Sequence, residues 1–254
     1  MSDTVLVLRT CQKDMSSWKG TFTWPASGHV ECPDWDPEPI CGNGLHGLLW
    51  GTGDGALLDW SSDAKWLVVE VLASDIVKIG EKVKFPKGNV IFCGSQLEAT
   101  KMIYAEGTGA PAGFAAMGIV GLHLDVGHHE TAIVGYKGVA TAGSQGSATA
   151  GDSGTATAGA EGTATAGDCG TATAGAEGRA TAGDYGTATA GSQGSATAGY
   201  KGTATAGNHG TISIKWWDEN AERYRLATGY IGENGLEPNT AYKLADEGKF
   251  VKVV

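Results

Sequence analysis

The sequence predicts a mainly β protein. A two-sheet parallel β-solenoid follows a mixed α+β N-terminal domain and precedes a small β C-terminal cap. The first supporting observation is an eight-residue repeat, which runs without insertion through nine octads from Gly138 to His209. The second is a sixteen-residue period in the turn residues, which makes two octads one coil. The third is that larger apolar residues replace Ala at both ends of the array, as the ends of a stack require.

Each octad is interpreted as one short strand and one tight turn. Gly occupies positions 1 and 6, and because Gly tolerates a positive φ, we expect the chain to turn there. The four residues between, usually Thr-Ala-Thr-Ala, favour a strand with alternating faces. Positions 3 and 5 hold Leu124 and Val126 in the first degenerate octad, and Ile212 and Ile214 in the last. Ala is therefore predicted to point inward and Thr outward.

The turn residues set the length of one coil. Asp152-Ser153 and Asp168-Cys169 alternate with Ala160-Glu161 and Ala176-Glu177, so equivalent turns recur every sixteen residues. One coil then contributes one strand to each of two parallel sheets. Twelve octads, from Leu122 through the octad at Gly210, give six coils. At about 4.7 Å per rung, the solenoid is about 28 Å long.

The chain is predicted to have four parts. We expect a mixed α+β recognition domain over residues 1–113, a linker over 114–121, the solenoid over 122–214 and the β cap over 215–254. Ser95 and Glu98 form a capping-box pattern before a predicted helix. The expected elements are strands at 4–10, 22–24, 66–72, 83–85 and 90–93, a turn at 86–88, the helix at 96–104, and cap strands at 240–244 and 250–254.

Composition excludes several classes of function. The net charge is −10, with 16 acidic and 9 basic residues in 1–130 but only 5 and 3 in 131–210. No basic patch follows a nucleic-acid backbone, and the solenoid is too weakly charged to mimic DNA, which needs about 16 charges over 28 Å. We expect no signal peptide, membrane segment or cofactor. Five Cys without a C-x-x-C motif suggest free thiols in the cytoplasm.

The outward Thr residues form the main candidate binding face. Their T-A-T-A-G octads, paired to sixteen, resemble the repeats of bacterial ice-nucleation proteins, and the resemblance covers residues 138–209. It implies that a regular Thr grid orders water to match ice. Thr is also simply a good strand residue that keeps a surface soluble, and this alternative stays open. The predicted binding face comprises Thr141, Thr155, Thr157, Thr171, Thr173, Thr187, Thr189, Thr203 and Thr205.

Two sets of side chains are candidate metal ligands. Stacked Asp152, Asp168 and Asp184 could bind Ca²⁺, but an Asp between glycines usually bonds turn backbone. The ligand types in a second set suit zinc, but their spacing does not match a zinc knuckle. Buried thiols are the alternative for that set, so no metal site is predicted. The second set is Cys11, Cys32, Cys41 and His46.

The N-terminal domain offers one candidate catalytic set. Arg9 on a first strand, His46 in a G-L-H-G turn and Glu70 on a central strand resemble the layout of ADP-ribosyltransferases, although the Glu-x-Glu loop is missing. His46 could equally be a structural hydrogen-bonding residue. The C-G-x-G-L-H-G and W-L-V-V-E-V blocks also resemble uncharacterised phage and prophage proteins. That resemblance implies a genomic context and no activity.

The function expected from the sequence is non-enzymatic. A rigid solenoid and an acidic N-terminal domain, at −7 by the counts above, would bind a protein partner. The partner could belong to a host defence system, and the solenoid could also form a homo-oligomer. Ice binding through the Thr face is the first alternative, and an ADP-ribosyltransferase-like enzyme is the second.

Overall fold

The computed structural model describes residues 3–17, 22–107, 118–245 and 248–253. The chain forms two compact units, residues 1–123 and 124–254. Residues 114–117, half of the predicted linker, lie outside the described residues. Among the described residues, no helix is both long and apolar enough to cross a membrane.

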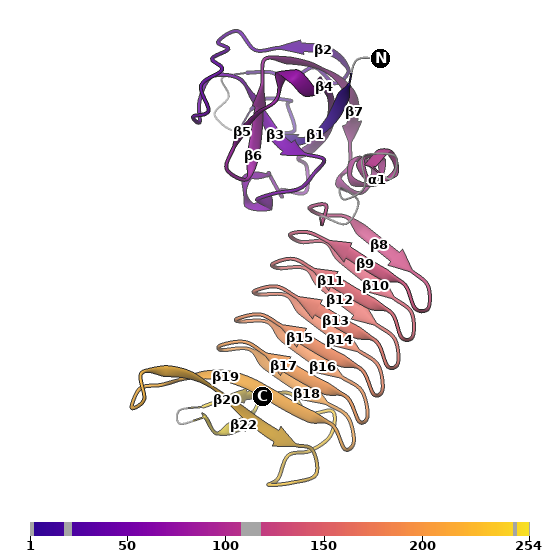
Figure 1. The fold of residues 1–254 in the computed structure, drawn as a ribbon, viewed down its shortest axis with the longest axis vertical. Coiled ribbons are helices and arrows are strands. Elements are labelled where there is room, and N and C mark those ends of the chain that lie inside the picture. The colour runs from indigo at the N-terminus through magenta and orange to yellow at the C-terminus, as the bar shows by residue number, and fades with distance from the viewer. Residues whose placement is uncertain (1–2, 18–21, 108–117, 246–247, 254) are drawn as a thin grey trace. The chain divides into compact units, whose positions relative to one another are not determined.

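The N-terminal unit is a curled antiparallel sheet with the strand order β2-β7-β4-β1-β3-β6-β5 (Figure 1). Its inner face carries an apolar core that includes Val7, Leu67, Val69 and Phe85. The strands are β1 (Thr4–Cys11), β2 (Gly28–Glu31), β3 (Leu45–Leu49), β4 (Lys65–Leu72), β5 (Val77–Ile79), β6 (Lys82–Phe85) and β7 (Lys87–Gly94), and two short 3₁₀ helices span Gly55–Leu57 and Ala73–Asp75.

Three local predictions in this unit are wrong. The expected strand at 22–24 is reduced to one isolated bridge between Thr23 and Ser16. The expected turn around His46 is strand β3, which pairs with both β1 and β6. Gly47 serves close packing there, since a Cβ would lie 2.4 Å from Val7 Cγ1. The expected turn at 86–88 is a bend and not a hairpin turn, because β6 and β7 are not paired with each other. β6 lies between β3 and β5, whereas β7 lies between β2 and β4. Pro86 accepts a hydrogen bond from the Cys32 main chain instead (2.8 Å).

The predicted helix is α1 (Gln96–Gly107), which contacts β1, β4 and β7. Ala99 and Ile103 are fully buried on it. The capping box is confirmed, because the Glu98 main chain donates to Ser95 Oγ (3.3 Å) and the Ser95 main chain donates to Glu98 Oε2 (3.4 Å). The Ser95 hydroxyl also donates to Glu98 and helps to lower the pKa of that carboxyl.

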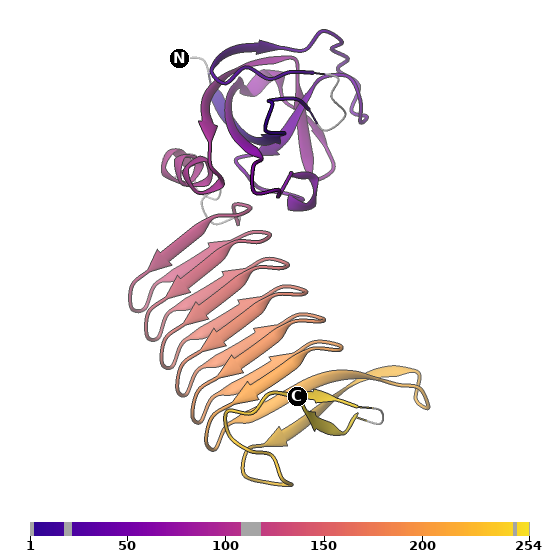
Figure 2. The same ribbon diagram turned by 180° about the vertical axis from the view of Figure 1, so that it is seen from behind.

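The second unit is the predicted two-sheet solenoid, with Ala inward and about six coils (Figures 1 and 2). Alternate strands join two parallel sheets, called here sheet D and sheet E. Sheet D contains β8 (His123–Val126), β10 (Val139–Ala142), β12 (Thr155–Ala158), β14 (Thr171–Ala174), β16 (Thr187–Ala190) and β18 (Thr203–Ala206). Sheet E contains β9 (Thr131–Val134), β11 (Ser147–Ala150), β13 (Thr163–Ala166), β15 (Arg179–Ala182), β17 (Ser195–Ala198) and β19 (Thr211–Asp218).

The repeat glycines have a different role from the one expected. No Gly between Gly138 and Gly210 has a positive φ, whereas the residue at position 8 does, as in Gln145 (59°) and Glu161 (56°). A Cβ on Gly159 would lie 2.6 Å from the main-chain nitrogen of Ser144 in the preceding coil. Gly is therefore required by close approach between coils, while the αL conformation falls on a residue with a side chain.

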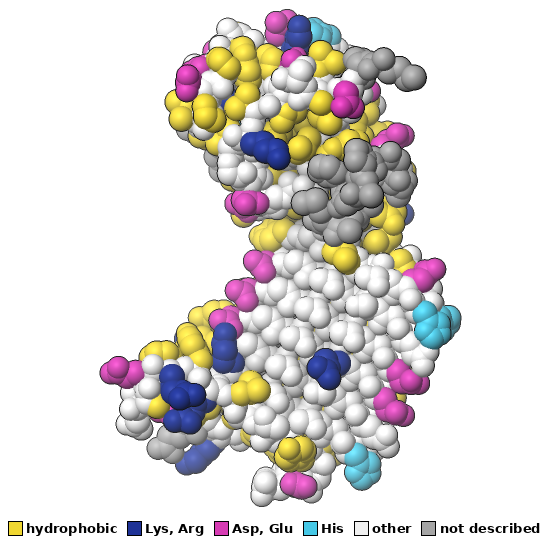
Figure 3. Space-filling model, in the orientation of Figure 1, with side chains coloured by type: hydrophobic (Ala, Val, Ile, Leu, Met, Phe, Trp, Pro, Cys, Tyr) yellow, Lys and Arg dark blue, Asp and Glu magenta, His cyan; other side chains and the backbone are white. Residues whose placement is uncertain are grey.

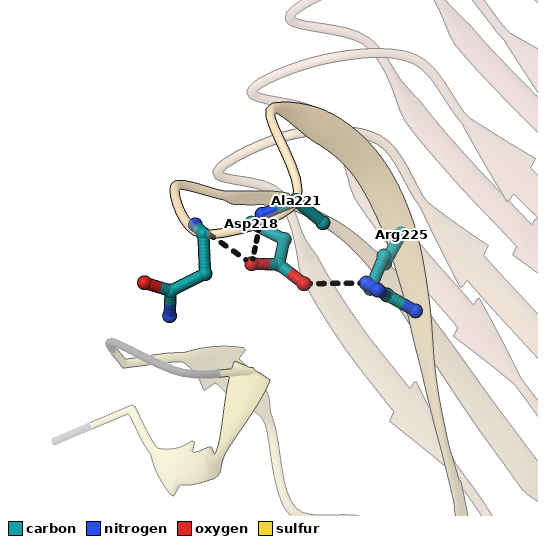
Figure 4. Close-up of polar contacts among 4 residues, drawn as sticks. Asp218, Ala221 and Arg225 are labelled. Atoms are coloured by element: carbon teal, nitrogen blue, oxygen red, sulfur yellow. Dashed lines mark hydrogen bonds and ion pairs between the residues drawn. The ribbon is translucent and has the colours of Figure 1, made fainter.

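A cap closes the C-terminal end of the stack with antiparallel strands. β20 (Arg223–Tyr230) pairs with β19, and β21 (Tyr242–Leu244) pairs with β18 and β22 (Phe250–Lys252). Ile212 and Ile214 are buried at this end together with Tyr242. The β19–β20 turn is held by Asp218, whose Oδ1 accepts from the main chains of Asn220 and Ala221 while its Oδ2 pairs with Arg225 (Figure 4).

Candidate functional site

The outward Thr residues of sheet D lie in two aligned columns. Thr155 is paired across neighbouring strands with Thr171, which is paired with Thr187, and the same register aligns Thr157 with Thr173. Rungs in such a sheet stand about 4.7 Å apart, and alternate residues along one strand about 6.6 Å apart. The columns continue to Thr203 and Thr205, while Thr141 begins the second column, and Val139 stands beside it in the first.

The inner side of the same strands keeps the outer face regular. Ala172 and Ala188 are fully buried, and the equivalent Ala residues on every coil of the strict array are no more than 4% exposed. Identical small side chains let every coil repeat the same backbone, so no bulge displaces a Thr. The hydroxyl and methyl groups of the Thr columns therefore repeat at the spacing of the backbone itself.

Sheet E carries a less uniform outer face. In its first outward column Arg179 stands between Thr163 and Ser195, and the second column begins with Ile133. Figure 3 shows a solenoid face that is largely uncharged and interrupted by a basic side chain. A guanidinium is larger than a hydroxyl and carries a charge, so it breaks the periodic array of water contacts on that sheet.

Main-chain hydrogen bonds extend the regular spacing through the turns. The Gly143 carbonyl accepts from the Gly146 main chain within one turn (3.1 Å), and the Gln145 main chain donates to the Ala160 carbonyl one coil later (2.8 Å). With positive φ at the third turn residue, this is the pattern of a type II turn. Each corner is thus bonded to the next, as each strand is, and the coils cannot slide relative to one another.

A ladder of aspartates supports one row of turns. The Asp152 carboxylate accepts from the main chain of Asp168 (2.9 Å), and Asp168 accepts in turn from Asp184 (2.8 Å). The last carboxylate, Asp184, accepts from Tyr200 (2.8 Å) and pairs with Lys215 (2.6 Å). Lys215 and the Tyr200 main chain lower the pKa of Asp184. These carboxylates bond the turn of the following coil, which gives the stacked aspartates a structural role.

Sequence reasoning missed an aromatic cluster beside this ladder. Tyr200 packs edge-on against Tyr185 (6.3 Å between ring centroids) and Tyr224 (5.6 Å), and Tyr224 packs against Trp217 (5.0 Å). The Lys215 ammonium lies 4.9 Å from the centroid of the Tyr224 ring. Turn residues of the last coils thereby contact the cap. The replacement of small turn residues by Tyr near the C-terminal end was the available signal.

Only two members of the candidate catalytic set come together. Arg9 Nη1 donates to the main-chain oxygen of His46 (2.8 Å), and its guanidinium lies 4.6 Å from the centroid of a Trp24 ring. Arg9 is paired with Leu67 in the β1–β4 register, so Glu70, three residues further, faces the opposite side of the sheet. The Glu70 carboxylate accepts instead from the Thr4 hydroxyl (3.4 Å).

Burial dominates the electrostatics around Arg9 and His46. Desolvation lowers the pKa of Arg9 to about 10. Desolvation, with smaller effects of Lys82, Arg9 and Lys84, lowers the pKa of His46 to about 4. Arg9 Nε and His46 Nε2 are both buried without a hydrogen-bond partner. The imidazole is therefore neutral at pH 7, and it lies beside cations instead of the carboxylate of the proposed set.

The residues weighed as zinc ligands do not form a cluster. Cys11 and Cys32 are buried, while Cys41 is exposed and lies 3.2 Å from Lys82 Nζ. Within the described ranges, no group of three His, Cys, Asp or Glu side chains is arranged to hold a metal ion.

Comparisons with known proteins separate the two units. Residues 5–105 match a family described as a domain of unknown function (DUF7666). An ice nucleation protein of Xanthomonas campestris pv. translucens is 42% identical over 103 residues, which are 40% of this chain and 6% of that protein. One of Pseudomonas syringae is 44% identical over 105 residues, 41% of this chain and 9% of that protein. Ice nucleation protein InaU of Pantoea ananas is 41% identical over 103 residues, 40% of this chain and 10% of that protein. No solved structure matches the chain significantly.

These findings correct two expectations from the sequence. The protein-binding scaffold of phage origin is wrong as the leading function, because the relatives found are ice nucleation proteins. The cytoplasmic location is contradicted as well, because the relatives found are ice nucleation proteins. The chain spans no more than a tenth of the length of these relatives. It is therefore similar over about two fifths of its residues to bacterial ice nucleation proteins, and over its N-terminal part to a domain of unknown function.

Proposed function

We propose that the solenoid binds ice through the Thr columns of sheet D. The single observation that carries this proposal is the unbroken register of Thr155, Thr171, Thr187 and Thr203 across four rungs. Each Thr presents a hydroxyl that can donate and accept a hydrogen bond, beside a methyl group that limits how water can be oriented. A repeating array of such groups favours one ordered arrangement of the first water layer. The similarity to ice nucleation proteins supports an interaction of this surface with ice.

The size of the array limits what one copy of this chain does. Four rungs span about 14 Å from first to last at about 4.7 Å each. A nucleus of ice must exceed a critical size before it grows, and a patch of this extent templates only a small part of one. We therefore expect a single copy to adsorb to existing ice and to slow its growth weakly, without nucleating ice.

Paired substitutions test which face of the solenoid binds ice. Thr171→Lys with Thr187→Lys places two charges on adjacent rungs of sheet D, while Thr131→Lys with Ser147→Lys does the same on sheet E. The measurement is the fraction of protein taken up by a slowly growing ice crystal, with thermal hysteresis as a second reading. The parent and the sheet E variant should be enriched in the ice, and the sheet D variant should be excluded from it.

Circular dichroism and melting curves verify that all three proteins keep their fold. Exclusion of the parent protein from ice would overturn the proposal. Equal uptake of both variants would show that the Thr columns of sheet D are only a soluble surface. Equal loss in both variants would assign the effect to net charge.

A further inference from the structure

Three sulfur atoms converge inside the sheet of the N-terminal unit. Cys11 Sγ lies 3.9 Å from Met15 Sδ, and Cys93 Sγ lies 3.8 Å from the same atom. Cys11 ends β1 and Cys93 belongs to β7, the two strands that flank β4. Their partners on β4 are Lys65 and Leu67, two residues apart. Both thiols therefore point to the same inner face, where Leu67 is fully buried.

The backbone places the Met15 sulfur against these thiols at a conformational cost. Met15 has a φ of 69°, a left-handed conformation that a residue with a long side chain rarely adopts. Two main-chain bonds fix it, since Met15 donates to the Gln12 carbonyl (2.9 Å) and accepts from Trp24 (2.9 Å). These bonds hold the backbone from which the Met15 side chain reaches both thiols.

Charged neighbours favour an anionic complex at the sulfurs. Burial raises the pKa of Cys11 to about 11, an effect that Cys93 and Asp14 reinforce and that Arg9 and Lys65 oppose. Burial also raises the pKa of Cys93, and Lys65 again opposes it. A free cysteine thiol keeps its proton at neutral pH, and a ligand with high affinity for sulfur displaces that proton. Arg9 and Lys65 then offset the negative charge that the two thiolates bring.

We propose that Cys11, Met15 and Cys93 bind one soft monovalent metal ion, Cu(I) or Ag(I). Thiolate and thioether sulfur are the ligands that Cu(I) prefers, whereas Mg²⁺ and Ca²⁺ prefer oxygen. Three sulfurs around an ion at about 2.3 Å stand about 4 Å from one another, close to both measured separations. Binding replaces two S–H bonds with two metal–thiolate bonds, adds the thioether as third ligand and releases two protons. No change of oxidation state is involved.

The strand arrangement argues against a disulfide between these two thiols. Cys11 and Cys93 stand on either side of β4, so their Cα atoms are about two strand spacings, or about 10 Å, apart. A disulfide requires Cα atoms closer than about 7 Å. Met15 Sδ, which contacts both thiols, supplies the third donor of the proposed site.

The test uses the full chain with the three other thiols removed by Cys32→Ala, Cys41→Ser and Cys169→Ser. Silver nitrate is titrated by calorimetry at pH 7, and Cu(I) affinity is measured under anaerobic competition with bicinchoninate. We expect one ion per chain and two protons released per ion. Met15→Leu should weaken binding at least tenfold and Cys93→Ser at least a hundredfold. Met102→Leu, in α1, is the matched control and should change nothing.

Two results would overturn this site. One is unchanged affinity in Met15→Leu, and the other is a stoichiometry of two ions, one on each separate thiol. Circular dichroism checks the fold of each variant. If Met15→Leu does not fold, X-ray absorption of the Cu(I)-loaded parent decides, because three sulfur neighbours support the site and two refute it.

Discussion

Lys215 on β19 lies 2.6 Å from the carboxylate of Asp184, the last rung of the aspartate ladder. This ion pair connects the turns of the solenoid to the strand on which the cap is built. Asp184 is also the acceptor for the Tyr200 main chain, so one carboxylate joins two successive coils and the cap. The end of the stack is therefore held by polar contacts as well as by buried Ile212 and Ile214.

Stability at acid pH should depend on this carboxylate. The pKa of Asp184 is lowered in the folded protein, so its contribution is present above the unfolded pKa and is lost as pH falls through the folded value. We expect Asp184→Asn to lower the melting temperature at pH 7 and to have little effect once the pH is below both the unfolded and the folded pKa. Melting curves from pH 7 to pH 2 measure this. A difference that persists unchanged at pH 2 would contradict it.

His46 should also make stability fall with falling pH, but in a higher pH range than Asp184. Its pKa is lowered to about 4, mainly by burial. Below about pH 6.5 the unfolded chain binds a proton that the folded protein does not, so stability falls between roughly pH 6.5 and 4, by on the order of 1–3 kcal/mol. His46→Gln should flatten this slope in denaturant unfolding experiments. The same slope in the variant would show that other groups cause it.

The inward and outward positions of β14 should respond differently to the same residue. Ala172→Leu adds volume to a thin core in which Ala172 is fully buried, and should cost about 1–3 kcal/mol or more. Thr173→Leu, on the next residue, points outward and should change stability by about 0.5 kcal/mol or less. Thermal melts of the two variants compare them, and equal melting temperatures would refute the assignment of faces.

The turn residues offer a test of why glycine recurs. Gly159→Ala should destabilise, since the new Cβ would lie 2.6 Å from the Ser144 nitrogen although its φ is ordinary. Glu161→Asn should be neutral or stabilising by up to about 1 kcal/mol, because Glu161 holds a φ of 56° that Asn tolerates better. Denaturant midpoints give both values. A harmless Gly159→Ala would show that the coils can move apart.

The repeat itself determined the architecture of the second unit. Because each octad has the same strand and turn, identical units must stack in register, and the sixteen-residue period of the turns sets the number of sheets. The larger residues at 124, 126, 212 and 214 revealed which face is inward. The Thr columns of the candidate site on sheet D followed from the same periodicity. So did the presence of Arg179 in the outward column of sheet E.

Features that depend on contacts between residues far apart in the sequence were decided only by the tertiary structure. The order of strands around β4 and the opposite faces of Arg9 and Glu70 arise from pairing between segments far apart in the chain. Local propensity contains no information about which strand becomes the neighbour of which. For the same reason the meeting of Cys11, Met15 and Cys93 was invisible in the sequence, whose spacing suggested other ligand sets. In a repeat, the period of the sequence predicts which strands become neighbours. In the antiparallel sheet of the N-terminal unit, the neighbours are set by contacts between residues far apart in the sequence.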